Sequence, residues 1–169
     1  VNTYITPNYA WLASALRMEL ECNPLKSKAA RRRAINKFFK AARRAVKVSR
    51  RFKNELPHAL RELAAAFALA GQKKRVKRLL LESLAVAQQQ DAHYEMALTR
   101  QMFGAIGREL RWPESEEMAA TATLQLEALR HSVAEEDQET SISLVDRFDT
   151  LLSSGREIAS TMRRELILQ

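Results

Sequence analysis

Glycine, proline and cysteine are all scarce in this chain, and their scarcity limits the folds it can adopt. Its 169 residues include 4 Gly and 4 Pro, too few for a sheet with many turns. Ala, Leu, Glu, Arg and Lys dominate instead, and these residues favour helix. With 46% apolar residues the chain can bury a core without metals or disulfides. We therefore predict an all-α fold.

The single cysteine and the short apolar runs exclude two further classes of protein. Cys22 has no second cysteine for an internal disulfide, and nothing resembles a secretory signal, so we expect a cytoplasmic setting and a half-buried or buried Cys22. The longest apolar runs, such as residues 63–70, are well short of the roughly 20 residues that cross a bilayer. No membrane span is predicted. The chain starts at Val1 and ends within a helical pattern, as we expect of a segment of a larger protein.

Acidic residues are nearly absent from the first half of the chain. Residues 1–78 hold 20 Lys and Arg against 4 Asp and Glu, a balance of +16, whereas residues 79–169 hold 8 against 16, a balance of −8. The predicted basic surface comprises Arg31, Arg32, Arg33, Lys37, Arg43, Arg44, Lys73, Lys74 and Arg75. Such a surface can neutralise phosphates or pair with the acidic half of this chain or of a neighbour. It can also be simply the solvent-exposed face of a helix, with no partner.

Prolines fall between the amphipathic stretches, where helices begin or connections run. We predict helices over about residues 8–21, 27–54, 57–70, 73–90, 92–106 and 114–132. The second is long enough to overhang its neighbours or to break near Ser49, and Gly71 and Gly107 are predicted as left-handed helix ends. These helices form three hairpins over residues 1–133. An acidic linker at 134–140 and a last helix at 141–169 follow.

The two glycines also indicate an internal repeat. Placing Gly71 over Gly107, a shift of 36 residues, superimposes Phe67 on Phe103. In the second helices of the first two hairpins, small and apolar residues recur at a shared i, i+4, i+7, i+11 spacing. The residues predicted to pack between repeats are Trp11, Ala34, Phe38, Leu60, Leu63, Ala64, Phe67, Gly71, Val76, Leu80, Phe103 and Gly107.

The middle hairpin resembles the tetratricopeptide repeat in the spacing of Leu60, Leu63, Ala64, Phe67, Gly71, Val76 and Leu80. That family carries large apolar, small and aromatic residues in a first helix before a turn glycine, and further packing residues in a second helix. The resemblance implies tandem antiparallel hairpins in a right-handed superhelical stack, which buries the faces that no single hairpin covers. Unrelated helix pairs in an orthogonal bundle are the alternative.

Two stretches outside the middle hairpin extend the resemblance. One is YAWLASALR at residues 9–17, and the other is SLVDRFDTLL at 143–152 with GREIA at 155–159. With the repeats, they resemble the helical-repeat region of large bacterial signalling proteins, which join a serine/threonine-kinase-like domain and a P-loop ATPase module to a GAF domain and an output domain, often a histidine kinase. The resemblance implies a segment that scaffolds or regulates neighbouring modules, with protein as its partner, and it supplies no active-site residue.

The last helix has a heptad pattern. Its predicted seam consists of Leu144, Phe148, Leu151, Ile158 and Met162. This pattern favours a parallel two-helix connector between protomers, and so a homodimer through residues 141–169. A capping helix on the last hairpin is the alternative.

Motifs for catalysis are missing. His58 lies in a faint likeness of a histidine-kinase phospho-acceptor box, but the acidic residue and the proline of that box are absent, and His93 and His131 have no second ligand at metal-binding spacing. No glycine-rich phosphate loop occurs. We predict no catalytic, cofactor-binding or metal-binding residue. The predicted function is a non-catalytic protein-interaction and signal-relay segment; the alternative is a basic, helical nucleic-acid-binding domain.

Overall fold

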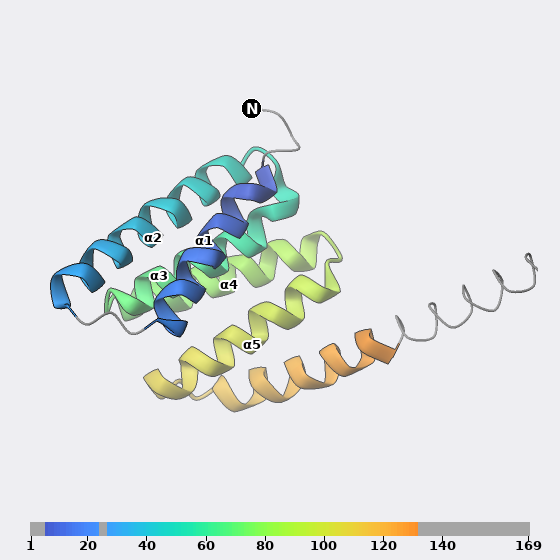
Figure 1. Cartoon of the computed structure of the whole chain (residues 1–169). Coiled ribbons are helices and arrows are strands. Elements are labelled where there is room, and N and C mark those ends of the chain that lie inside the picture. Colours follow the sequence, from blue (N-terminus) through green and yellow to red (C-terminus); the bar gives the residue numbers. More distant parts are fainter. Residues whose placement is uncertain (1–5, 24–26, 132–169) are drawn as a thin grey trace, which may run out of the picture. The chain divides into compact units, whose positions relative to one another are not determined.

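The computed structural model describes residues 6–23 and 27–131, and its regular elements are helices. They are α1 (Thr6–Cys22), α2 (Lys28–Ser49), the 3-10 turn η2 (Lys53–Glu55), α3 (Leu56–Leu69), α4 (Lys73–Gln89) and α5 (His93–Leu110) (Figure 1). A further helix covers residues 115–131. No strand occurs in these ranges, and the prediction of an all-α fold is confirmed.

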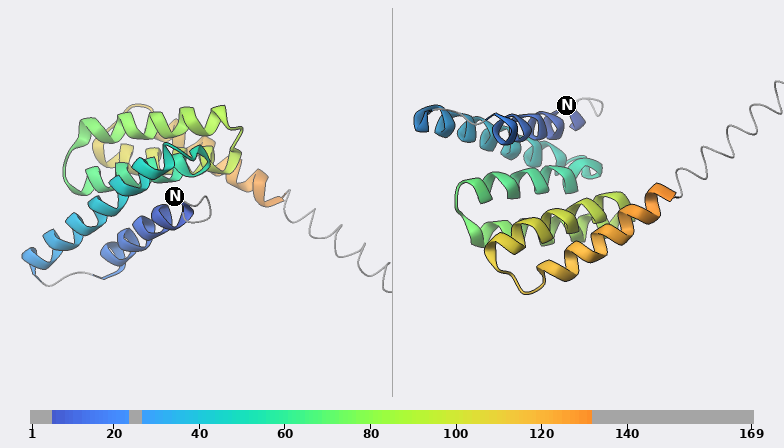
Figure 2. Two further views of the ribbon diagram at one scale, coloured as in Figure 1. Left: turned by 90° about the horizontal axis from the view of Figure 1, so that it is seen from above. Right: turned by 60° about the horizontal axis from the view of Figure 1, so that its bottom comes forward.

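The chain divides into two compact units, Val1–Leu126 and Glu127–Gln169. Within the first unit each helix packs on the next, and α3 also packs on both α1 and α5 (Figure 2). Of the second unit the structure describes residues 127–131, which are helical. The predicted linker at 134–140 and the predicted connector helix at 141–169, with its seam residues, lie outside the described residues.

The core of the first unit forms around α3. Eleven of its 14 residues are buried, because neighbouring helices cover it on several sides. Its alanines let those helices approach closely, and the large side chains of Phe38, Leu60, Val76 and Leu80 fill the space between them. Each of these four side chains stabilises the fold by about 1.5–3 kcal/mol through removal from water.

Most of the predicted packing residues occupy the core. The buried ones are Phe38, Leu60, Leu63, Ala64, Phe67, Val76, Leu80, Phe103 and Gly107, while Ala34 is half-buried and Gly71 lies in an exposed turn. Trp11 is 64% exposed, with an edge-on contact between its ring and that of His58 in α3. Cys22, expected to be at least half-buried, is also exposed.

The two glycines predicted as helix ends behave differently. Gly71 has a φ of +74° and ends α3 as predicted. Gly107, by contrast, lies inside α5, which continues to Leu110, and Arg111 takes the left-handed position with a φ of 56°. A Cβ on Gly107 would lie 2.8 Å from the Cβ of Ser115. Gly107 therefore permits a close helix contact, and the turns at positions 71 and 111 do not follow the predicted shift of 36 residues.

The second predicted helix is also shorter than expected. α2 ends at Ser49, the point where a break was considered, and the chain then turns through η2 before α3 begins. For the remaining helices, most of the predicted ends lie within two residues of the observed ends.

Candidate functional site

The most strongly charged surface of the described residues lies on α2. This helix contains nine Lys and Arg and no acidic residue. Its buried side chains, Phe38, Ala42, Ala45, Val46 and Ser49, face the core. We call the exposed cations on the opposite side, together with Arg51 in the turn that follows α2, the basic face of α2; those on the helix are Arg32, Arg33, Lys37, Lys40, Arg43, Arg44 and Lys47. At 100° per residue these positions fall on one side of the helix.

The basic face carries an energetic cost to the helix. Like charges recur four residues apart, as in Arg33 and Lys37 or Arg43 and Lys47, and each such pair destabilises a helix by about 0.2–0.5 kcal/mol. Lys28 lies in the first turn, where the helix dipole also disfavours a cation. Arg50, beside this face, lies 3.8 Å from Glu82. Lys40, Lys47 and Arg51 have no carboxylate within 4.0 Å among residues 6–23 and 27–131.

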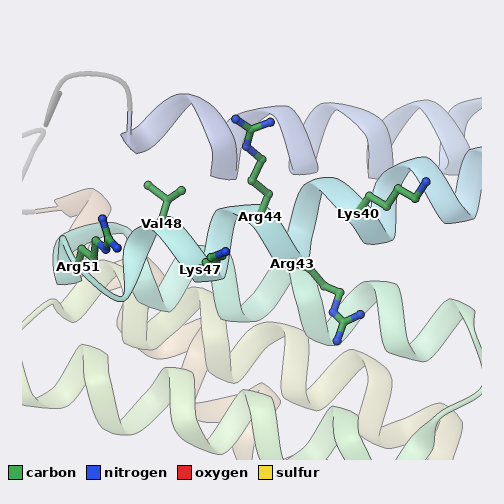
Figure 3. Close-up of a pocket in the computed structure, with 6 residues that line it drawn as sticks. All are labelled: Lys40, Arg43, Arg44, Lys47, Val48 and Arg51. Carbon is green, nitrogen blue, oxygen red and sulfur yellow. The ribbon is translucent and has the colours of Figure 1, made fainter. Parts of the chain in front are cut away.

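Part of the basic face forms an open hollow of about 640 Å³ on the surface. Its lining residues, Lys40, Arg43, Arg44, Lys47, Val48 and Arg51, are drawn in Figure 3. Arg44 donates a hydrogen bond of 3.2 Å to the Tyr9 hydroxyl and lies 4.8 Å from the centre of its ring. The guanidinium of Arg43 lies 5.4 Å from the Phe39 ring. Both arginines thus contact an aromatic ring, whereas Lys40 and Lys47 have no ring contact or ion pair among the described residues.

All nine residues of the predicted basic surface are exposed. Six of them lie on α2, and the other three, Lys73, Lys74 and Arg75, open a different helix, α4. Arg75 lies 5.2 Å from the Phe67 ring. In the structure five of the six residues on α2 belong to its basic face, and the other three form a separate group at the start of α4.

A polar cluster that the sequence analysis did not predict joins α1 to α3. The buried Ser14 hydroxyl donates a hydrogen bond of 2.9 Å to Glu62 and lies 2.8 Å from Nε2 of His58. Nε of Arg17 donates to Glu62 at 3.0 Å and its Nη1 pairs with Glu21 at 3.0 Å. Glu62 is 2% exposed, and four hydrogen bonds to its carboxylate compensate for that burial.

His58 is the titratable centre of this cluster. Burial, and then the guanidinium of Arg61, lower its pKa, against the opposing effect of Glu62. Glu55 lies 4.0 Å from Nδ1 of His58, and burial, reinforced by the charge of Glu95, raises the pKa of Glu55. The ring of Trp11 meets the His58 ring edge-on, with 5.1 Å between centroids.

Serine, histidine and carboxylate thus converge, and the Ser14 hydroxyl is directed at the carboxylate. In a serine nucleophile the histidine accepts the hydroxyl proton. Here the Ser14 hydroxyl donates to Glu62, and the donor between Ser14 and Nε2 of His58 is set by the imidazole tautomer. Ser14 is itself buried. We interpret the cluster as a structural junction between helices.

A second polar cluster joins α3 to α5. The buried Arg61 lies 2.6 Å from Glu95 and donates a hydrogen bond of 3.2 Å to Thr99. Thr99 lies 3.0 Å from Ser83 of α4, and the Ser83 hydroxyl donates to the carbonyl of Pro57 at 2.9 Å. Both clusters were missed because their residues lie tens of positions apart in the sequence. The sequence does contain one sign of these clusters, because the charged residues Arg61 and Glu62 lie within a helix that is otherwise mostly apolar.

The described residues offer no metal site and no membrane-spanning helix. Within residues 6–23 and 27–131, no three His, Cys, Asp or Glu side chains gather so that they could hold a metal ion. No helix in the same ranges is both long and apolar enough to cross a bilayer. Comparisons of the chain with protein-family models, with curated proteins and with solved structures find no match.

Three large apolar side chains are exposed on the outward side of α1, among the polar Asn8 and Glu19. Trp11, Leu12 and Met18 are 64%, 50% and 56% exposed. Their spacing places them on one side of the helix, opposite Ala10 and Ala13 of the core. We call these three residues the apolar face of α1.

Proposed function

We propose that this chain is a non-catalytic helical-repeat segment that binds other protein segments and relays signals between neighbouring modules of a larger signalling protein. The observation that carries the proposal is the apolar face of α1. Single exposed apolar residues are common, but Trp, Leu and Met side chains at least half exposed on one helix side are typical of a protein contact surface. A helix of the same polypeptide or of another protein would bury this face.

The proposal includes a tetratricopeptide-like stack of hairpins. Its support is that α3 packs on both α1 and α5, so that the first helices of consecutive hairpins lie side by side. Ion pairs bridge both contacts, Arg17 with Glu62 and Arg61 with Glu95. In repeat arrays each unit contacts its neighbours in this manner, and the faces at the two ends of the stack need cover. The apolar face of α1 is such an end face.

The signalling role rests on the resemblance of residues 9–17, 143–152 and 155–159 to the helical-repeat region of large bacterial signalling proteins. The first of these stretches carries Trp11 and Leu12, two residues of the apolar face of α1. This coincidence supports a role of that stretch in contacting another module.

Site-specific photo-crosslinking tests the proposal. A photoreactive residue replaces Met18 in the full-length parent protein, or in cells that express this chain, and products are identified by mass spectrometry. We expect one discrete crosslinked protein segment, which Trp11→Glu abolishes. Leu124→Glu is the matched control, since Leu124 is 68% exposed on another helix. A crosslinking pattern that Trp11→Glu leaves unchanged would contradict the proposal.

A further inference from the structure

The cations on the basic face of α2 have no carboxylate within 4.0 Å among residues 6–23 and 27–131, and the ion pair beside the face joins Arg50 to Glu82. Such a concentration of unpaired like charges attracts a polyanion. The question is which class of polyanion the geometry favours.

The face offers no ring on which a single-stranded base could stack. Phe38 is buried in the core, and the other two rings beside the face, Phe39 and Tyr9, lie next to Arg43 and Arg44. Proteins that bind single strands combine cations with exposed aromatic platforms. The basic face of α2 supplies the cations without the platforms.

An anionic membrane also fits poorly. A helix that lies on a membrane buries an apolar side between the lipids while its cations face the headgroups. The apolar side of α2 packs into the protein core through Phe38, Ala42 and Ala45. No second apolar side is left on α2 for insertion.

A duplex fits the shape of the basic face. Arg32 and Lys47 are 15 residues apart, which corresponds to about 22 Å along a helix. A duplex carries one phosphate charge per about 1.7 Å of its axis, so a band of cations of this length faces several phosphates. Arg43 and Arg44 each contact a neighbouring ring, and their guanidinium groups suit phosphate oxygens.

We propose that the basic face of α2 binds the phosphate backbone of double-stranded nucleic acid without reading its sequence. Lys40, Arg43, Lys47 and Arg51, which line the hollow in Figure 3, contact the phosphates. This activity is separate from the protein contact of α1 and does not depend on it.

Fluorescence anisotropy with a labelled duplex, measured with the full chain over a series of salt concentrations, tests this assignment. For about four phosphate contacts, the logarithm of the binding constant should fall with the logarithm of salt concentration with a slope of about −4. In Lys40→Gln/Lys47→Gln the slope should become less negative by about 2. Both lysines are exposed, and their removal relieves repulsion between like charges on α2, so the melting temperature should not fall and will confirm folding.

Two variants and two competing probes serve as controls. Lys40→Arg/Lys47→Arg keeps the charge and should bind as the wild type does. Arg108→Gln/Arg111→Gln removes the same charge near the end of α5, which Figure 2 places at the opposite side of the stack from α2, and should keep the slope. Equal binding by the wild type and Lys40→Gln/Lys47→Gln would overturn the proposal. So would tighter binding to phosphatidylserine vesicles or to polyglutamate than to the duplex at the same salt concentration.

Discussion

Single glycines inside α5 act as contact points between helices. A Cβ on Gly104 would lie 2.7 Å from the Cβ of Ala119 and 3.0 Å from its backbone, closer than real side chains approach. Gly104→Ala should therefore lower the free energy of unfolding by about 1–2 kcal/mol, because overpacking outweighs the better helix propensity of alanine. Urea unfolding of Gly104→Ala, Ala119→Gly and the double variant measures the coupling. We expect Ala119→Gly to relieve the clash, and strictly additive effects would contradict this contact.

His58 should make stability depend on pH. Its pKa is lowered in the folded protein, so near its ordinary value of about 6.5 the unfolded chain binds a proton that the folded chain does not. The free energy of unfolding should then decrease as the pH falls below about 6.5, by at most about 1.4 kcal/mol per pH unit for one proton. Glu55, whose pKa is raised, opposes this trend at lower pH.

Urea unfolding between neutral and mildly acidic pH checks this dependence, with His58→Gln as the comparison. Glutamine keeps a hydrogen-bond donor for Ser14 but does not titrate. We expect a weaker pH dependence in His58→Gln. The same dependence in both proteins would mean that other groups cause it.

At the scale of elements, a buried ion pair should hold α1 on α3. Arg17 pairs with two carboxylates at 3.0 Å each, the buried Glu62 and the exposed Glu21. Glu62→Ala leaves a half-buried guanidinium and the Ser14 hydroxyl without their acceptor, and should lower the free energy of unfolding by about 3 kcal/mol. Glu21→Ala removes an exposed pair within one helix and should change it by at most about 0.5 kcal/mol. Chemical denaturation of both variants tests the difference, and similar losses would contradict it.

The helices themselves were predictable from the sequence, and their polar junctions were not. Apolar side chains recurring every three or four positions, with prolines and Gly71 between them, suffice to predict α1, α3 and α4. The end of α5 was predicted wrongly because glycine commonly ends a helix, whereas Gly107 lies inside α5 and permits a close contact with Ser115. On a helix, charged residues are usually solvated. Arg61 and Glu62 gave no sign of their partners, since pairing depends on how the helices stack.

For the basic face of α2, the sequence predicted which cations are exposed but not how they are arranged around the helix. The six arginines and lysines predicted on α2 are exposed as expected. Five of them lie on the basic face of α2 and Arg31 does not, and this arrangement depends on which side of α2 is buried. That side follows from the packing of Phe38, Ala42 and Ala45 into the core, where α2 contacts α1 and α3.

At the scale of the whole molecule, the heptad pattern of residues 141–169 predicts a dimer. The core cluster runs from Ala10 to Phe103, so a chain truncated after residue 131 keeps it and should still fold. Sedimentation velocity should show a dimer for the full chain and a monomer for residues 1–131. A charge placed in the seam by Leu151→Asp should also give monomers, because it would be buried between two helices. Ser153→Asp, two residues away and outside the seam, should leave the dimer intact. If the full chain and residues 1–131 are both monomers, the parallel connector is excluded and the capping helix is favoured. If instead a dimer survives both the truncation and Leu151→Asp, the contact lies on the hairpins. The apolar face of α1 would then be the surface to test.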